Sequence, residues 1–179
     1  MGDKVIIAPY DAGWVDEYRE LEKMIKEQMG ELAVRIDHIG STAVPGLAAK
    51  PVIDIQVSVK AFEPFAPIKN ALEAAGFRYM EGNPERTKRY FREAEGNKRT
   101  HVHVRLEGHW SQQFPLLFRD YLRTHREDSL RYELLKYTLA ERFPDDREGY
   151  VGGKESLIWD IMRRADRWAQ ETGWTTEAL

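Results

Sequence analysis

Apolar positions along the chain follow two periodicities, one typical of helices and one typical of strands. Between residues 14 and 29 they recur at steps of three and four, which predicts a helix that buries one stripe and ends at Gly30. The same spacing predicts helices over residues 65–75, 111–123, 128–142 and 155–170. Because the last three follow one another, we expect a helical C-terminal half, with Gly152 and Gly153 in a loop before its final helix.

Short runs of β-branched and aromatic residues, bounded by Gly, Pro and Asn, predict the strands. They cover residues 5–8, 32–39, 52–59, 77–80, 87–92 and 99–106. The turn residues 95–97 between the last two runs predict a hairpin. Together the elements predict an α+β fold, with a mixed sheet of about four to six strands flanked by helices. We expect residues 1–179 to form a single domain.

Composition narrows the classes of function that this fold can serve. The 179 residues include 27 Lys and Arg and 30 Asp and Glu, and the net charge of -3 argues against a general nucleic-acid binder. The absence of cysteine excludes disulfides, thiolate zinc sites and a cysteine nucleophile. Apolar runs such as residues 5–8 fall far short of the roughly 20 residues of a membrane span, and no signal peptide is evident. We therefore expect a cytoplasmic protein that does not contact membranes.

Residues 38–57 contain the most informative chemistry. A predicted strand ends in Gly40, Ser41 and Thr42, and such a turn offers backbone amides and hydroxyls to a phosphate. The next strand is largely apolar and carries one acid, Asp54, which alternation places on the same face as Gln56. A carboxylate there needs a hydrogen-bond partner, an ion pair or a metal. The pattern predicts a Mg²⁺ and phosphate site, with a purely structural Asp54 as the alternative.

Two histidines on a later strand extend this prediction. His101 and His103 alternate onto one face of residues 99–106. If this strand pairs with residues 52–59, both imidazoles share a cleft wall with Asp54. Such a set, with His38 as a further candidate ligand, suits Zn²⁺, Mn²⁺ or Fe²⁺. The alternative is that the histidines only form hydrogen bonds within the sheet.

Positive charge is concentrated around the predicted hairpin, at Arg86, Lys88, Arg89, Arg92, Lys98, Arg99 and Arg105. These residues, interleaved with aromatic rings, suit the phosphates of a nucleotide or a single nucleic-acid strand. A solvated edge hairpin that resists aggregation explains them equally well. Lys50 lies in the loop before Asp54, where it either meets a phosphate or stays exposed.

The run from His38 to Val57 resembles the signature of the GrpB family, which is assigned to the nucleotidyltransferase superfamily. The resemblance continues through residues 100–104 and 118–123, Tyr132 to Lys136, and Tyr150 with Lys154. It implies a nucleotidyltransferase-like fold. Related domains are fused to dephospho-CoA kinase, which implies nucleotide or coenzyme chemistry. The resemblance also makes Arg119 and Tyr121 candidates for closing the cleft beside Asp54. The alternative is that they belong to a charged helix surface.

The superfamily pattern is a Gly-Ser turn, a strand with two acids, and a third acid on a neighbouring strand, which together hold two divalent cations. Gly40, Ser41 and Asp54 match this pattern, whereas Gln56 replaces the second acid. This replacement argues against two-metal catalysis. It leaves one metal, or a module that binds a nucleotide without transferring anything.

Our prediction from the sequence is a metal-assisted transfer of a nucleotidyl or phosphoryl group from a nucleotide or other phosphorylated molecule to a small molecule. The predicted catalytic residues are Asp54 and His103, and Asp54, His101 and His103 are the predicted ligands of Mg²⁺ or Mn²⁺, with Zn²⁺ a weaker candidate. The predicted phosphate-binding residues are Gly40, Ser41, Thr42, Lys50, Arg89 and Arg119. The alternatives are a non-catalytic nucleotide- or coenzyme-binding module, a histidine-metal hydrolase and an RNA-binding module. Trp159, Trp168 and Trp174 are expected to be packing residues.

Overall fold

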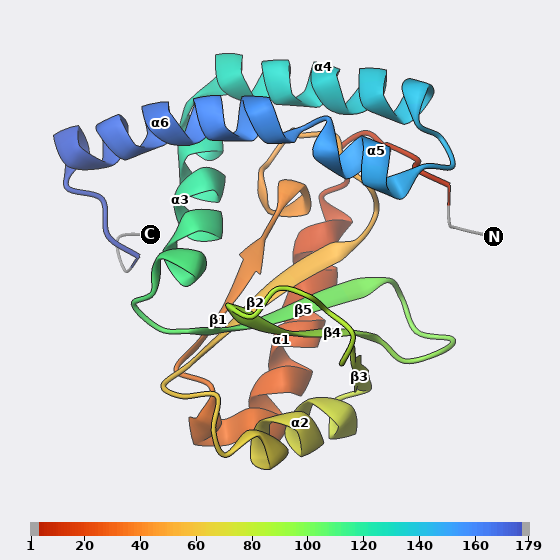
Figure 1. Cartoon of the computed structure of the whole chain (residues 1–179), viewed down its shortest axis with the longest axis vertical. Helices are drawn as coiled ribbons and strands as arrows, with labels where there is room; N and C mark the ends of the chain where they lie inside the picture. The colour runs from red at the N-terminus through yellow and green to blue at the C-terminus, as the bar shows by residue number, and fades with distance from the viewer. Residues whose placement is uncertain (1–3, 177–179) are drawn as a thin grey trace.

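A computed structural model describes residues 4–176, and within them one mixed sheet forms the centre of the fold (Figure 1). Its strands are β1 (Arg35–Ile39), β2 (Ile53–Val59), β3 (Phe77–Tyr79), β4 (Lys88–Glu93) and β5 (Thr100–Leu106). They are ordered β1-β2-β5-β4-β3. β2 and β5 are parallel, and every other neighbouring pair is antiparallel. The two strands that carry the candidate chemistry are therefore direct neighbours.

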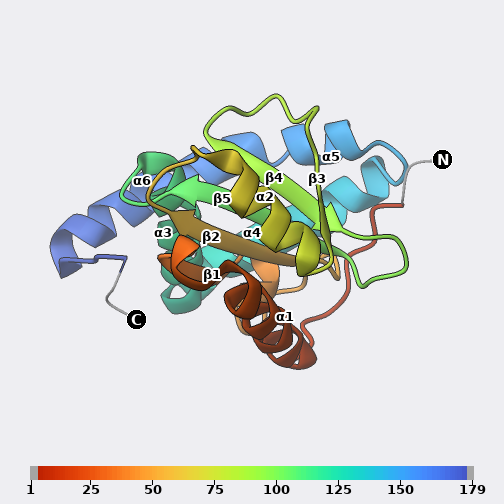
Figure 2. The ribbon, with the colours of Figure 1, turned by 90° about the horizontal axis from the view of Figure 1, so that it is seen from below.

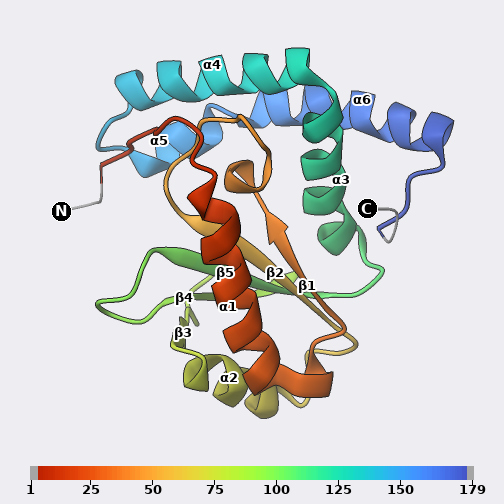
Figure 3. The ribbon, with the colours of Figure 1, turned by 180° about the vertical axis from the view of Figure 1, so that it is seen from behind.

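Two helices cover one face of the sheet, as Figure 2 and Figure 3 show. They are α1 (Gly13–Met29) and α2 (Phe65–Ala74). Their apolar stripes pack on the sheet residues that alternate toward them, including Ile55, Val57 and Val102, all fully buried. Since side chains alternate along a strand, Asp54, Gln56, His101 and His103 are directed to the opposite face.

The helical half lies on that opposite side. It contains α3 (Trp110–Thr124), α4 (Arg126–Arg142), α5 (Arg147–Gly152) and α6 (Glu155–Thr172). In Figures 1 and 3, α4 and α6 run side by side beyond the end of the sheet, and α3 connects them to it. A second apolar core joins α3, α4 and α6 to Val44 and Leu47 of the loop between β1 and β2. This loop is consequently held between the sheet and the helices.

The structure confirms the α+β fold with a mixed sheet and a helical C-terminal half, and it corrects some of the predicted elements. Residues 5–8 form no strand, because only Ala8 makes an isolated bridge, to Ala49. The first strand begins at Arg35 rather than at residue 32, because residues 30–32 form a 3₁₀ turn. The sequence analysis also missed α5, which Asp146 caps by accepting a hydrogen bond from the amide of Gly149.

Pro115 lies inside α3. A proline has no amide hydrogen, so the carbonyl of Ser111, four residues earlier, loses its usual helical donor. Arg105 of β5 donates a hydrogen bond to this carbonyl. The proline therefore creates a contact that ties α3 to the sheet.

No helix between residues 4 and 176 combines the length and the apolar character required to cross a membrane.

Candidate metal and phosphate site

The register between β2 and β5 places three candidate ligands together. Asp54 lies opposite His101 and Gln56 lies opposite His103. The Asp54 Oδ1 is 3.2 Å from the Nδ1 of His101 and 3.3 Å from the Nε2 of His103. All three residues offer a ligand atom within 4.8 Å of the others. One carboxylate and two imidazoles form a donor set that suits Mn²⁺, Zn²⁺ or Fe²⁺ better than Mg²⁺, which prefers oxygen ligands.

The two imidazoles also control the charge of the carboxyl group. Burial favours the neutral acid, but hydrogen bonds from His101 and His103 outweigh it and hold the pKa of Asp54 below its usual range. Burial lowers the pKa of His103, although Asp54 opposes this effect. A carboxylate beside a neutral imidazole is the protonation state in which both groups can bind a metal. Tyr90 packs against both rings, with centroids 5.6 Å from His101 and 5.3 Å from His103.

The turn after β1 brings the backbone unusually close to Asp54. Gly40 has φ 74° and ψ -173°, a conformation available almost only to glycine. A Cβ atom at this position would lie 2.9 Å from the Asp54 Oδ2. Glycine is therefore required here both by the backbone conformation and by the space beside the carboxylate. Residues 41–43 continue as a single 3₁₀ turn.

Two arginines of α3 donate hydrogen bonds to backbone carbonyls on either side of this turn. Arg119 donates to the carbonyl of His38, at 2.9 Å, and Arg123 donates to the carbonyl of Ala43, at 3.0 Å. Arg119 is buried and also pairs with Asp120 at 2.7 Å. It does not line the pocket described next, so its prediction as a phosphate ligand is not supported. Its spacing with Arg123 indicates a shared helix face, but only the fold shows that this face supports the turn.

A pocket of about 200 Å³ opens beside the turn and Asp54, and we call it the cationic pocket. It is lined by Gly40, Ser41, Thr42 and Lys50, all predicted from the sequence, and by His101. The helical half adds Tyr132, Lys136, Arg147, Tyr150 and Lys154. Four cationic side chains thus surround a hollow whose floor contains one carboxylate, an arrangement suited to a polyanion that also meets a metal.

Burial and neighbouring positive charges disfavour the protonated form of two lysines of the cationic pocket. Burial, assisted by the neighbouring Lys154, lowers the pKa of Lys136 to about 7. Burial, assisted by Lys50, lowers the pKa of Lys154 to about 8. Lys50 and Lys154 lie 4.9 Å and 4.5 Å from the ring centroid of Tyr150. An incoming anion would relieve the repulsion between these charges, so the pocket favours a negatively charged ligand.

Gln56 stands where the superfamily pattern has a second acid, and its side chain is buried away from solvent. The side chain is fully buried and its Nε2 donates to the carbonyl of Gln112 in α3, at 2.9 Å. A carboxylate at this position would face that carbonyl oxygen without a proton to share. The structure therefore gives Gln56 a packing role between β2 and α3.

Two further predictions from the sequence need correction. His38 is not part of the ligand set, because it stacks on Tyr18 and hydrogen-bonds to the Thr42 hydroxyl at 2.9 Å. Burial, with the charges of Arg123 and Arg119, lowers its pKa to about 4, so it remains neutral. Arg89 lies over the ring of Phe62, on the face of the sheet covered by α1 and α2, because it alternates with Tyr90. It therefore cannot reach phosphates in the cationic pocket.

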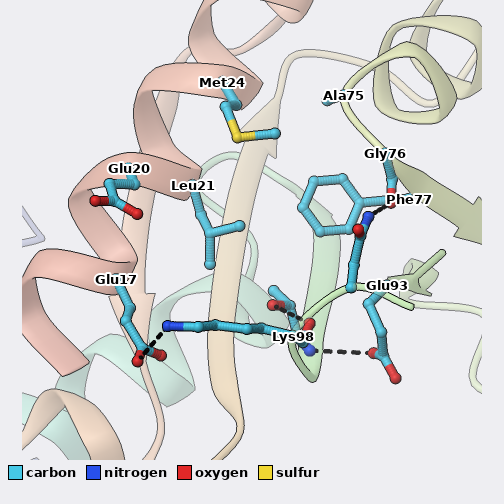
Figure 4. Close-up of a pocket in the computed structure, with 11 residues that line it drawn as sticks. Glu17, Glu20, Leu21, Met24, Ala75, Gly76, Phe77, Glu93 and Lys98 are labelled. Carbon is cyan, nitrogen blue, oxygen red and sulfur yellow. Dashed lines mark hydrogen bonds and ion pairs between the residues drawn. The ribbon is translucent and has the colours of Figure 1, made fainter. Parts of the chain in front are cut away.

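The basic hairpin carries less free charge than its sequence suggests. Lys88 pairs with Glu85 at 2.7 Å, and Arg92 pairs with Glu93 at 2.9 Å. Lys98 reaches across to Glu17 at 2.8 Å, at the rim of a separate pocket between α1 and the sheet (Figure 4). Local ion pairs thus account for part of the charge pattern of the hairpin.

The sequence gives no indication of Arg147 and suggests no individual site role for Tyr132, Lys136 and Tyr150, whereas Lys154 is a candidate to point into the site from the loop before the last helix. A repeated spacing could have indicated them, because a lysine follows a tyrosine by four residues at both Tyr132–Lys136 and Tyr150–Lys154. Residues four apart share one face of a helix, which places Tyr132 and Lys136 on one face of α4, whereas Lys154 lies in the turn between α5 and α6. No comparable sequence signal marks Arg147.

Solved structures show which class of fold this site belongs to. The chain matches terminal uridylyl transferase 4 from Trypanosoma brucei, solved with bound dUTP, with a TM-score of 0.54 at 13% identity, over 87% of this chain and 55% of that one. It also matches the Cid1 poly(U) polymerase, solved with bound MgATP, with a TM-score of 0.53 at 12% identity, over 73% of this chain and 43% of that one. The fold is therefore that of a nucleotidyltransferase-like protein.

A family model and a solved structure of higher sequence identity identify the family of the chain. The family model described as GrpB protein matches residues 4–164, and the chain belongs to the GrpB family. The crystal structure of GrpB from Enterococcus faecalis matches with a TM-score of 0.82 at 32% identity, over 91% of this chain and 99% of that one.

Curated relatives are longer than this chain. UPF0157 protein YqkA of Bacillus subtilis is 37% identical over 166 residues, which are 92% of this chain and 48% of YqkA. A protein of Mycolicibacterium paratuberculosis named dephospho-CoA kinase is 33% identical over 95% of this chain and 48% of its own length. The chain thus spans about half the length of these relatives, and their names describe the longer proteins.

Proposed function

We propose that the chain is a metal-dependent transferase that moves a nucleotidyl group from a nucleoside triphosphate to a hydroxyl group of a small molecule. The observation that carries this proposal is a shared residue. Asp54 belongs to the donor set with His101 and His103, and it also lies on the floor of the cationic pocket. A metal held by this set would therefore adjoin the phosphates held by the lysines.

The donor set fits one divalent ion, and its two imidazoles favour Mn²⁺ over Mg²⁺. When bound, such an ion supplies charge neutralisation at the phosphate oxygens and activates the attacking hydroxyl. Asp54, His101 and His103 would hold it. The lowered pKa of Asp54 keeps the carboxylate ionised for this role.

The residues of the chain account for the remaining parts of the transfer. The acceptor oxygen forms a bond to the α-phosphorus, the bond from that phosphorus to the bridging oxygen breaks, and pyrophosphate leaves with the electron pair. The acceptor proton passes to solvent, directly or through a neighbouring carboxylate or imidazole. Lys50, Lys136, Arg147 and Lys154 stabilise the leaving pyrophosphate. The hydroxyls of Ser41 and Thr42 orient the phosphates at the turn.

A second candidate function is favoured by the two imidazoles. Histidine-rich donor sets are common in metal hydrolases, and a metal held by Asp54, His101 and His103 would then activate a water in place of an acceptor hydroxyl. The same pocket would then hold the phosphates of the molecule that is hydrolysed. Hydrolysis of a nucleotide in the absence of any acceptor distinguishes this function from transfer.

The first test is nucleotide binding with and without Mn²⁺, measured by the thermal midpoint and by calorimetry. ATP, CTP, GTP and UTP are compared, and at least one is expected to raise the midpoint by several degrees at 100 times its Kd, in a Mn²⁺-dependent manner. Lys154→Met should weaken the binding about tenfold or more. Lys69→Met is the matched control, because Lys69 lies on the opposite side of the sheet, exposed and loosely paired with Glu73.

The second test is turnover, followed by pyrophosphate release and by transfer of an α-phosphate label to pooled small-molecule acceptors. Asp54→Asn should preserve the fold and abolish transfer. Failure of every nucleotide to bind overturns the proposal. Tight binding with no transfer and no hydrolysis assigns the chain to the non-catalytic alternative.

A further inference from the structure

A second pocket adjoins the first, and Asp54 lines both. It has a volume of about 470 Å³, which lies within the range of small-molecule pockets, roughly 300–1,000 Å³. Its walls come from α3, α4, α6 and the sheet, and its aromatic residues are Trp110, Phe114, Phe118, Tyr132 and Trp159. We call it the aromatic pocket. Gly40, Asp54 and Tyr132 line both pockets, so the two hollows meet at the candidate metal ligand.

The aromatic rings that line this pocket form two groups of contacting rings. Trp110 packs edge-on against Phe114 with centroids 5.7 Å apart, and Phe114 packs against Trp159 at 5.4 Å. Deeper in, Phe118 packs edge-on against Tyr132 at 5.4 Å. Trp110 is 54% exposed and Trp159 is 48% exposed. Trp159 thus packs only at the surface, against Phe114, whereas Trp168 and Trp174 pack against the helical core.

The two pockets differ sharply in charge. Apart from Asp54, the charged residues that line the aromatic pocket are Glu85 and Arg105, and these two pair with each other at 3.7 Å. Arg105 also donates to the carbonyl of Ser111. The aromatic pocket thus offers ring faces and little net charge, whereas the cationic pocket suits phosphates. A ligand for the aromatic pocket is planar, largely apolar and without a phosphate of its own.

The chemistry of phosphoryl and nucleotidyl transfer assigns a position to each reactant. The attacking oxygen and the leaving oxygen lie roughly in line, on opposite sides of the phosphorus. If pyrophosphate leaves into the cationic pocket, the nucleophile approaches from the side of Asp54 that faces the aromatic pocket. We propose that the aromatic pocket binds the acceptor, a neutral small molecule whose planar ring lies against Trp159 and Phe114 and whose hydroxyl is directed to Asp54. This inference rests on the proposed function.

The test uses 2-naphthol as a neutral, planar probe with one hydroxyl, and cyclohexanol as a probe without a planar ring. Binding to the full chain is measured by calorimetry, in the presence and absence of Mn²⁺ with a saturating non-hydrolysable ATP analogue. We expect 2-naphthol to bind in both conditions and more tightly than cyclohexanol. Trp159→Ala should weaken 2-naphthol binding about fivefold or more, because one stacking partner is lost.

Three controls make the result specific. Trp159→Phe should retain binding within about threefold, since it keeps an aromatic face. Leu134→Ala should change nothing, because Leu134 is 69% exposed on α4 and lies outside both pockets. Nucleotide binding should be unchanged in Trp159→Ala, which shows that the variant is folded.

Each contrary result overturns the inference in a recognisable way. Displacement of 2-naphthol by the nucleotide analogue would mean that the base of the donor occupies the aromatic pocket. Equal affinities of the parent chain and Trp159→Ala would place the probe elsewhere. If nucleotides bind and 2-naphthol does not, the inference fails alone. If 2-naphthol binds as expected and no nucleotide does, the aromatic pocket stands as a ligand site, and its assignment to an acceptor falls with the proposed function.

Discussion

Replacement of Gly40 by alanine tests the close approach between the turn and the candidate metal ligand. Two effects act on the variant. Alanine at φ 74° and ψ -173° carries a backbone strain of about 1–3 kcal/mol. Its Cβ would also meet the Asp54 Oδ2 at 2.9 Å, closer than an unstrained contact. We assign a further 1–2 kcal/mol, roughly, to the displacement of the carboxylate.

The chain contains a matched control for the backbone strain alone. Gly46 has φ 78°, and a Cβ there would meet no atom within 4 Å. Gly46→Ala should therefore lose only about 1–2 kcal/mol, whereas Gly40→Ala should lose about 2–5 kcal/mol. For a chain of this length, 1 kcal/mol corresponds to a fall of about 2–4 °C in Tm, so Gly40→Ala should lower Tm by roughly 4–20 °C.

The assay combines urea unfolding with Mn²⁺ titration of both variants. Because Gly40→Ala moves Asp54, it should weaken Mn²⁺ binding about tenfold, while Gly46→Ala should leave it unchanged. Combining Gly40→Ala with Asp54→Ala removes the clashing oxygen and should recover part of the lost stability. Equal losses of stability in the two glycine variants, together with unchanged Mn²⁺ affinity in Gly40→Ala, would refute the reasoning.

Four other predictions concern the side chains around the site. Sulfate should bind the cationic pocket about tenfold more weakly at pH 9 than at pH 6.5, because Lys136 and Lys154, with pKa values lowered to about 7 and about 8, lose their charge. Sulfate itself does not titrate in this range. A sulfate affinity that does not change with pH, measured by calorimetry, would contradict this prediction. Without a ligand, the same lysines bind protons more readily in the unfolded chain than in the folded one. Their contribution to the free energy of unfolding should therefore rise with pH from about 7 toward 10.5. In urea titrations at several pH values, Lys136→Met should show a smaller rise. Gln56→Glu should destabilise the chain by about 2–4 kcal/mol at pH 7 and by less at pH 5, where the new carboxyl protonates and can again donate to the Gln112 carbonyl; a neutral effect would mean that this position tolerates the second acid. Arg123→Met removes the donor to the Ala43 carbonyl and should lose about 1.5–3 kcal/mol and weaken nucleotide binding; a loss of stability with unchanged nucleotide affinity would show that the turn does not depend on this contact.

The local elements were largely determined by the sequence. The alternation of residues 52–59 and 99–106 predicts which side chains share a face, and the helical spacing predicts the long helices. The predicted elements are wrong where the sequence pattern is short, or where contacts with another segment determine the local structure. Residues 5–8 have a strand-like composition but no partner along most of their length, and α5 has only six residues. Neither feature produces a periodicity long enough to detect.

The candidate site divides in the same way. The order of residues along β2 and β5 places Asp54, His101 and His103 on matching faces, so the sequence alone indicates the donor set. Whether the strands are adjacent and parallel depends on the complete sheet. The face of the sheet that holds Arg89, and the contacts that bury Arg119 behind the turn, depend on packing between elements far apart in the chain.

For this protein, the sequence by itself determined the family, the α+β pattern, the glycine turn and the one acid in an apolar strand, because each of these is a property of neighbouring residues. Only the tertiary structure decided which cations surround that acid and which aromatic rings line the adjoining pocket. Lys136, Arg147 and Lys154 come from helices some 80 to 100 residues after Asp54 along the chain. Their approach is produced by the burial of α3, α4 and α6 against the loop between β1 and β2, and burial is a property of the whole fold.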